Sequence, residues 1–105
     1  MDRSDVVFLI KETPTRNEYK VLTTIKTERE VYCQVHTISQ KEFFKAGEQG
    51  LKPQFRFTIA NSADYNGEKI VVYNGKEYAV YRTYIKDTEA IELYVEEKVG
   101  INGKG

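Results

Sequence analysis

The chain has 105 residues, and its 16 lysine and arginine side chains are balanced by 16 aspartate and glutamate side chains, so the formal net charge is zero. The length predicts one domain with a modest core, and neutrality argues against a dedicated nucleic-acid binder, whose affinity usually rests on a basic excess. Cys33 is the one cysteine, which excludes an intramolecular disulfide and a cysteine-based metal cluster.

The N-terminal third predicts strands. Residues 5–11 are a continuous apolar run, short enough to be a strand that is buried on both faces. Residues 12–17 contain threonine, proline and asparagine and predict a loop. Residues 19–27 predict a strand that is irregular or curved. Residues 28–38 alternate with period two, so Val31, Cys33 and Val35 share one face of a further strand.

Residues 39–53 form the longest predicted connection. Residues 40–46 are helix formers, and two glycines and a proline follow them. A connection of this length in a small β domain is usually functional or disordered, and the adjacent Phe43 and Phe44 argue against a merely solvated tether. We expect one long loop that is partly helical or disordered, and partly disordered in the isolated subunit.

The C-terminal half predicts hairpins. Phe55, Phe57 and Ile59 alternate with polar residues in a strand over 54–60, and residues 61–68 have turn composition. Asn74-Gly75 joins strands predicted over 69–73 and 76–86, because this dipeptide favours a tight hairpin turn. A last strand is predicted over 90–99, and residues 100–105 predict a frayed tail. Together these elements indicate an all-β fold, a small antiparallel β-barrel forming a single domain over residues 1–105.

The tyrosine-rich hairpin 73–84 has two interpretations. It is a stacking platform for single-stranded nucleic acid, as in oligonucleotide-binding barrels, or its tyrosines fill the barrel wall and a subunit interface. Neutral charge favours the second. Strict alternation along 76–86 places Tyr81 and Arg82 on opposite faces.

No pattern in the chain indicates catalysis. His36 is the one histidine, and no cysteine or carboxylate stands at ligand spacing from it, so we expect no metal site. No nucleophile with an orienting base and no glycine-rich phosphate loop is present. We expect no enzyme, no cofactor and no catalytic residue. No apolar run is long enough to span a bilayer, residues 1–5 lack a signal-peptide pattern, and we expect no membrane partner.

Charge is unevenly distributed along the neutral chain. The segment 39–53 leans basic, and the strand 90–99 leans acidic, with Glu92, Glu96 and Glu97 beside the preceding Glu89. A basic arm and an acidic strand on one subunit suit head-to-tail association, which generates a ring when the rotation closes.

The order of several motifs resembles the head-tail joining, or head-closure (stopper, head completion), proteins of tailed bacteriophages. The resemblance is carried by Glu-Arg-Glu-Val-Tyr-Cys-Gln-Val at 28–35, Ser39 with Glu42-Phe43-Phe44, Ala46-Gly47 and Gly50-Leu51-Lys52-Pro53, Asp64-Tyr65-Asn66-Gly67-Glu68, the hairpin Tyr73 to Tyr84, and Ile91-Glu92-Leu93-Tyr94. It covers nearly the whole chain.

The resemblance implies a barrel with a long loop and a structural role in the virion neck. It implies a ring, about twelvefold, beneath the portal-bound adaptor protein, with the chain made in the bacterial host cytoplasm. The ring would retain packaged double-stranded DNA and present the docking surface for a tail-terminator or tail protein. We expect the isolated subunit to be monomeric and to bind DNA weakly or not at all.

Three groups of residues follow as site hypotheses. The channel or gating loop comprises Lys41, Glu42, Lys45, Gly47, Gln49, Gly50 and Lys52. The loop anchor or subunit interface comprises Phe43, Phe44 and Leu51. A further interface surface comprises Tyr81, Arg82, Tyr84 and Tyr94.

Overall fold

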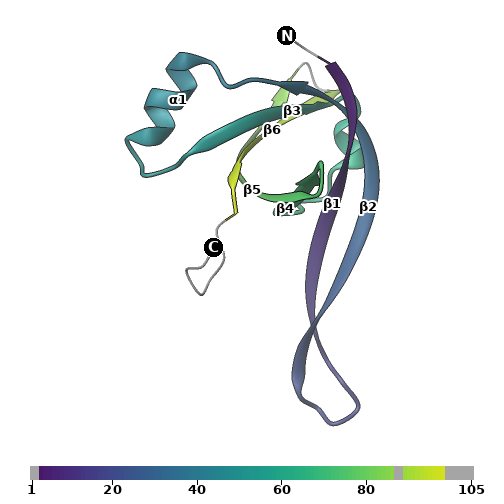
Figure 1. Cartoon of the computed structure of the whole chain (residues 1–105). Coiled ribbons are helices and arrows are strands. Elements are labelled where there is room, and N and C mark those ends of the chain that lie inside the picture. The colour runs from purple at the N-terminus through teal and green to yellow at the C-terminus, as the bar shows by residue number, and fades with distance from the viewer. Residues whose placement is uncertain (1–2, 87–88, 99–105) are drawn as a thin grey trace.

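The structure, a computed structural model, describes residues 3–86 and 89–98, in which six strands form one closed antiparallel barrel (Figure 1). The predicted tail 100–105 lies outside the described residues. The elements are β1 (Arg3–Arg16), β2 (Leu22–His36), α1 (Gln40–Gly47), β3 (Pro53–Ile59), the 3-10 turn η1 (Ser62–Asp64), β4 (Ile70–Tyr73), β5 (Lys76–Lys86) and β6 (Ala90–Glu97). The strand order is β1-β2-β3-β6-β5-β4, and pairing of β4 with β1 closes the sheet. The predicted all-β barrel is confirmed.

The inward faces that period-two alternation predicts form the core. Val31, Cys33 and Val35 are buried on β2, and Phe57 and Ile59 on β3. The rings of Phe57 and Tyr73 meet edge to face with their centroids 5.3 Å apart, a favourable geometry for aromatic pairs. Burial, with a contribution from Asp5, raises the pKa of Cys33 to about 12. The thiol is therefore a core group and not a nucleophile.

The hairpin signal is confirmed at the β4–β5 turn. Asn74 and Gly75 both have positive φ, 54° and 77°, as a two-residue type I′ turn requires. Tyr73 pairs with Lys76 across this turn, which sets the register of the two strands. The turn composition predicted over 61–68 corresponds to η1 and a bend, and the buried Glu68 holds this segment by an ion pair of 3.0 Å with Arg29 of β2.

The loop predicted over 12–17 is wrong, because β1 continues to Arg16 and pairs with β2 along its whole length. The two strands form a ribbon that projects from the barrel (Figure 1). A proline fits here for a register reason. The N–H of Asn17 donates to the Val21 carbonyl at 3.1 Å, which marks a hydrogen-bonded pair. Since such pairs alternate along a ladder, Pro14 opposite Thr24 needs no N–H for the ribbon.

The segment 39–53 folds as a capped helix and not as a disordered arm. Ser39 is the N-cap of α1, and its hydroxyl accepts a hydrogen bond from the Glu42 N–H at 3.1 Å. The sequence Ser39-Gln40-Lys41-Glu42 has the spacing of a capping box. After the helix, Gly50 takes a positive φ of 81° that favours glycine. The helical part of the prediction is confirmed, and the cap at Ser39 explains where the helix begins. Partial disorder of this segment in the isolated subunit stays a prediction.

Strict alternation along β5 is also wrong, because the strand contains a bulge. Val80 pairs with Val95 and Arg82 with Tyr94, so Tyr81 is an extra residue without a partner in this ladder. A bulge changes which face the following side chains occupy. Tyr81 and Arg82, predicted on opposite faces, both reach the outer wall.

Candidate functional site

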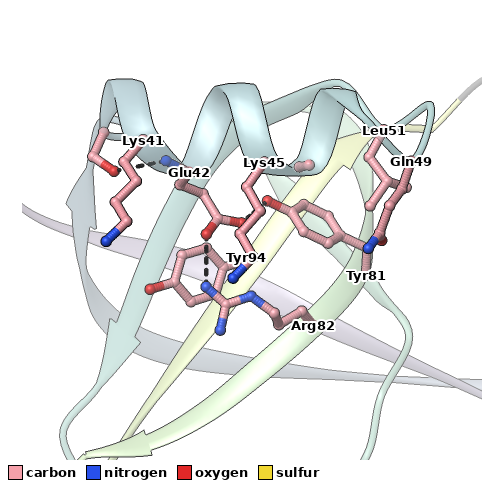
Figure 2. Close-up of a pocket in the computed structure, with 10 residues that line it drawn as sticks. Lys41, Glu42, Lys45, Gln49, Leu51, Tyr81, Arg82 and Tyr94 are labelled. Atoms are coloured by element: carbon pink, nitrogen blue, oxygen red, sulfur yellow. Dashed lines mark hydrogen bonds and ion pairs between the residues drawn. The ribbon is translucent and has the colours of Figure 1, made fainter.

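A cleft of about 420 Å³ lies between α1 and the outer wall formed by β5 and β6 (Figure 2). One side of the cleft is formed by α1 and the segment after it, and the other side is formed by β5 and β6. The lining residues are Ser39, Lys41, Glu42, Lys45, Ala46, Gln49, Leu51, Tyr81, Arg82 and Tyr94. Residues far apart in the sequence therefore build one concave surface on the outside of the barrel.

Glu42 is the centre of this cleft. One carboxylate oxygen accepts a hydrogen bond from the Tyr81 hydroxyl at 2.7 Å, and the other forms an ion pair of 2.7 Å with Arg82 (Figure 2). The Glu42 side chain is 14% exposed, compared with 43% for Arg82. Because Ser39 caps the helix, Glu42 lies in its first turn, where a negative charge is favoured. The contact holds α1 against the barrel wall.

The polar contacts continue from the cleft along the outer wall. The Arg82 guanidinium carbon lies 3.9 Å from the centroid of the Tyr94 ring, a cation–π distance. The Tyr94 hydroxyl donates to Glu92 at 2.9 Å, and Arg56 donates to the other oxygen of Glu92 at 2.8 Å. The charged groups along the wall therefore alternate in sign, and each contacts a partner within the subunit.

Alternation places Glu92 on the outer face correctly but does not predict that it is buried there. The pattern over 90–99 places it outward, yet it is only 5% exposed because Arg56 and Tyr94 cover it. The available signal is the register of β3 and β6, since Thr58 lies opposite Glu92 and Arg56 is its diagonal neighbour. Without that register, sequence alone does not identify the pair.

The environment of the cleft shifts the pKa values of its groups. Partial burial alone would raise the pKa of Glu42, but hydrogen bonds from Arg82 and Tyr81 and the positive charges of Arg82 and Lys45 lower it overall. Burial, followed by the Glu42 hydrogen bond, raises the pKa of Tyr81. The hydrogen bond to Glu42 raises the pKa of Arg82. Glu42 is therefore ionised and the tyrosine neutral at neutral pH, which suits binding and positioning.

Acid is expected to weaken the docking of α1. The folded-state pKa of Glu42 lies below its ordinary value of 4.5, so its stabilisation is complete above that value and is lost as pH falls through the lowered folded pKa. We expect Glu42→Gln to reduce the free energy of unfolding by about 1–2 kcal/mol near neutrality. Urea denaturation from about pH 6 to about pH 3 should show the difference from wild type shrinking as pH falls. A difference that grows toward acid would contradict the assignment, and Glu48→Gln, an exposed residue at the end of the same helix, is the matched control.

The cleft gathers residues from all three predicted groups. Those that line it are Lys41, Glu42, Lys45 and Gln49 of the gating loop, Leu51 of the anchor group, and Tyr81, Arg82 and Tyr94 of the interface surface. Gly47, Gly50, Lys52 and Tyr84 lie outside it, and Tyr84 is exposed on β5. The backbone N–H of Lys52 donates to Glu96 at 3.2 Å, which fixes the return of the chain to the barrel.

Phe43 and Phe44 do not anchor α1 on its own barrel. Their exposed fractions are 51% and 61%, and the two rings contact each other with centroids 6.0 Å apart. The anchoring contacts come instead from Glu42 and from Ala46, which is buried. Helical periodicity explains the difference, because residues 42 and 46 share the face toward the barrel. A subunit-interface role for the two phenylalanines stays a prediction.

The acidic strand and the tyrosine platform also differ from expectation. Glu92 pairs with Arg56, Glu97 with Lys76, and Glu96 accepts the Lys52 N–H, so the acidic groups of β6 are largely used within the subunit. In hairpin 73–84, Tyr73 and Tyr78 are buried in the core. These two rings are therefore not available for stacking on nucleic acid, whereas Tyr84 is exposed.

Sequence reasoning did not identify the tip of the β1–β2 ribbon. Its large apolar side chains are exposed, at 76% for Tyr19, 57% for Val21, 64% for Leu22 and 51% for Ile25. The available signal was the partly alternating stretch 19–27, which the sequence predicts as an irregular or curved strand. Exposed apolar clusters of this kind mark protein contact sites.

Within the part of the chain that the structure describes, no cluster of three or more histidine, cysteine or acidic side chains is placed to hold a metal ion. None of the helical residues described there forms a span long and apolar enough to cross a membrane.

Comparison with known proteins gives one family. A family model described as phage head completion protein matches residues 3–98. The match includes the ribbon, α1, the cleft and every strand of the barrel. No curated protein matches the chain.

Proposed function

Because this chain belongs to the phage head completion protein family, whose members are structural components of the head–tail junction, we propose that it closes DNA-filled heads. In this proposal the chain forms a ring beneath the portal and adaptor proteins. The ring retains the packaged DNA and provides the surface on which the tail docks.

The observation that carries the proposal is the exposure of apolar side chains on both elements that leave the barrel. Both α1 and the ribbon stand out from the barrel (Figure 1). Phe43 and Phe44 are exposed on α1, and Tyr19 and Leu22 are exposed on the ribbon. Because these side chains lie outside the core, they do not stabilise the isolated barrel by burial. They fit a subunit that is completed by its neighbours in an assembly.

The α1 segment is suited to a movable stopper. It is held to the barrel wall by the polar contacts of Glu42 and by a small buried residue, Ala46. An element with few buried apolar contacts opens at low free-energy cost. In the proposal Gly47 and Gly50 allow the segment to swing, and Lys41, Lys45 and Lys52 approach the DNA in the channel when it does.

Zero net charge fits this mechanism. DNA is kept in the channel by packaging, so a stopper needs to block a path and does not need to bind phosphate strongly. A single-stranded nucleic-acid binder would instead show affinity that falls steeply with salt. Burial of Tyr73 and Tyr78 also leaves less aromatic surface on the hairpin for that second function.

The test is reconstitution of heads that lack this chain. We expect such heads to expose their DNA to nuclease and to accept no tails, and we expect addition of the purified chain to protect the DNA and restore joining. A titration of the same purified chain with a single-stranded oligonucleotide at low salt should show no binding at micromolar concentration. Heads that keep their DNA and join tails equally well without the chain would overturn the proposal.

A variant of the ribbon tip sharpens the same assay. Leu22→Ser with Ile25→Ser removes two exposed apolar side chains and should leave the barrel folded, because neither residue belongs to the core. We expect fewer complete particles than with wild type. Thr23→Ser, on the same strand between them, is the matched control.

A further inference from the structure

We propose that the cleft beneath α1 receives the outer face of β2 from a second copy of this chain. The inference rests on the proposed ring and names the two surfaces that would meet in it.

The cleft carries a surplus of positive charge. Lys41, Lys45 and Arg82 line it against the single carboxylate of Glu42, so three cations face one anion. Glu42 is already paired with Arg82. Among the described residues Lys41 and Lys45 form no ion pair, and both are exposed at the mouth of the cleft (Figure 2). The cleft is thus built to accept acidic side chains.

The outer face of β2 carries the matching charge. Val31 and Cys33 point into the core, so the alternate residues Glu28, Glu30 and Tyr32 point outward. All three are exposed, Tyr32 by 77%. The two glutamates have no ion-pair partner in the part of the chain that the structure describes. We call this set the acidic stripe.

The acidic stripe also lies on an open strand edge. In the ladder between β2 and β3 the paired residues are 34–36 with 56–58, so the edge of β2 before residue 34 has no neighbouring strand among the described residues. Exposed edges are usually protected by charged side chains or covered by another chain. Here the same residues that protect the free edge are those that would bind a cation-lined cleft.

Position favours a second copy as the partner. The cleft and the acidic stripe lie on opposite sides of the barrel, with α1 at one side of Figure 1 and β2 at the other. Two different, complementary surfaces on opposite sides give a head-to-tail contact, which repeats around a ring. A symmetric dimer would need one surface that complements itself.

The structure favours the acidic stripe over DNA phosphate as the group that binds in the cleft. Two tyrosine rings, Tyr81 and Tyr94, line the cleft beside Arg82. Aromatic and arginine side chains are enriched at protein interfaces. The chain also supplies a complementary acidic surface of its own.

A charge exchange tests the contact in the reconstitution assay. K41E/K45E reverses the cleft, E28K/E30K reverses the acidic stripe, and a third variant combines all four changes. We expect each reversal alone to lower head closure at least about tenfold, because like charges then face each other across every subunit contact. We expect the combined variant to recover most of the loss. K69E/K86E, which reverses two other exposed lysines, is the control for overall charge and should behave as wild type.

The outcomes separate the two proposals. If wild type fails to close heads, the proposed function is wrong. If wild type closes heads and the reversals close them equally well, only this contact is wrong. If K41E/K45E loses closure and E28K/E30K does not restore it in combination, the cleft meets another partner such as DNA phosphate, which also overturns the contact.

Crosslinking gives a second readout that does not depend on closure. A chain with both Glu30→Cys and Lys45→Cys, treated with a short thiol crosslinker in assembled heads, should yield a ladder of multimers. A mixture of the two single-cysteine chains should stop at dimers. Wild type is the background control, because Cys33 is buried. Absence of a ladder in assembled heads would contradict the contact.

Discussion

Replacing Phe57 by alanine is expected to lower the free energy of unfolding by about 3–5 kcal/mol, the range for removal of a buried aromatic ring. Phe57 is fully buried, and its ring contacts those of Phe55 and Tyr73 at centroid distances of 5.8 and 5.3 Å. The substitution therefore leaves a cavity in the centre of the barrel. A small domain has a total stability of roughly 5–15 kcal/mol, so the substitution removes a large fraction of it.

Urea denaturation followed by tyrosine fluorescence measures this loss. Tyr84→Ala is the matched control, because Tyr84 is 55% exposed on β5, and surface changes usually lie within about 0.5 kcal/mol. A loss below about 1 kcal/mol for Phe57→Ala would mean that the ring is not central to the core.

The sequence predicted the barrel's repeating features because two simple signals act there. Period two identifies the inward faces of β3 and β6, where Phe57, Ile59 and Leu93 are buried. Asn74-Gly75 sets the β4–β5 turn because both residues adopt the positive φ that the turn requires at low cost. Both signals are local, so they do not depend on how the rest of the chain folds.

The errors arise where register decides the outcome. Pro14 signals a break, but it occupies a position in the β1–β2 ladder where no N–H is needed. Tyr81 is the extra residue of a β-bulge, and the residues next to it in the sequence do not predict a bulge. The burial of Glu92 depends on Arg56 of a partner strand. Each of these facts belongs to a pair of strands and not to one.

The candidate site was predicted in its residues but not in its arrangement. Glu42, assigned to the gating loop, and Tyr81 and Arg82, assigned to an interface, meet in one cleft. Their meeting needs the helix cap at Ser39 and the bulge at Tyr81 together. The capping signal is visible in the sequence, whereas the bulge is not, so their contact was out of reach of sequence reasoning.

Shortening the segment after α1 is expected to leave a folded barrel that no longer retains DNA. Deletion of residues 48–51 removes the turn that brings the chain back from the helix, including the bond of 3.1 Å from the Leu51 N–H to the Ala46 carbonyl. The barrel should survive, because the β2–β3 pairs lie at residues 34–36 and 56–58, outside the deletion. With the shorter connection, α1 could no longer pack over β5 and β6 or, in the proposed ring, extend into the channel. We expect reconstituted heads to become accessible to nuclease while the circular dichroism of the purified chain keeps its strand signal.

A replacement of the same length separates reach from side-chain chemistry. Glycine and serine at residues 48–51 keep the length of the segment and remove Leu51 from the wall of the cleft. If the segment acts as a stopper by its reach, this variant should protect DNA nearly as well as wild type while the deletion should not. If both variants leak, the contacts of Gln49 and Leu51 in the cleft, and not the length of the arm, hold the channel closed. If both protect the DNA, retention does not depend on this segment, and the proposed stopper role of α1 is wrong.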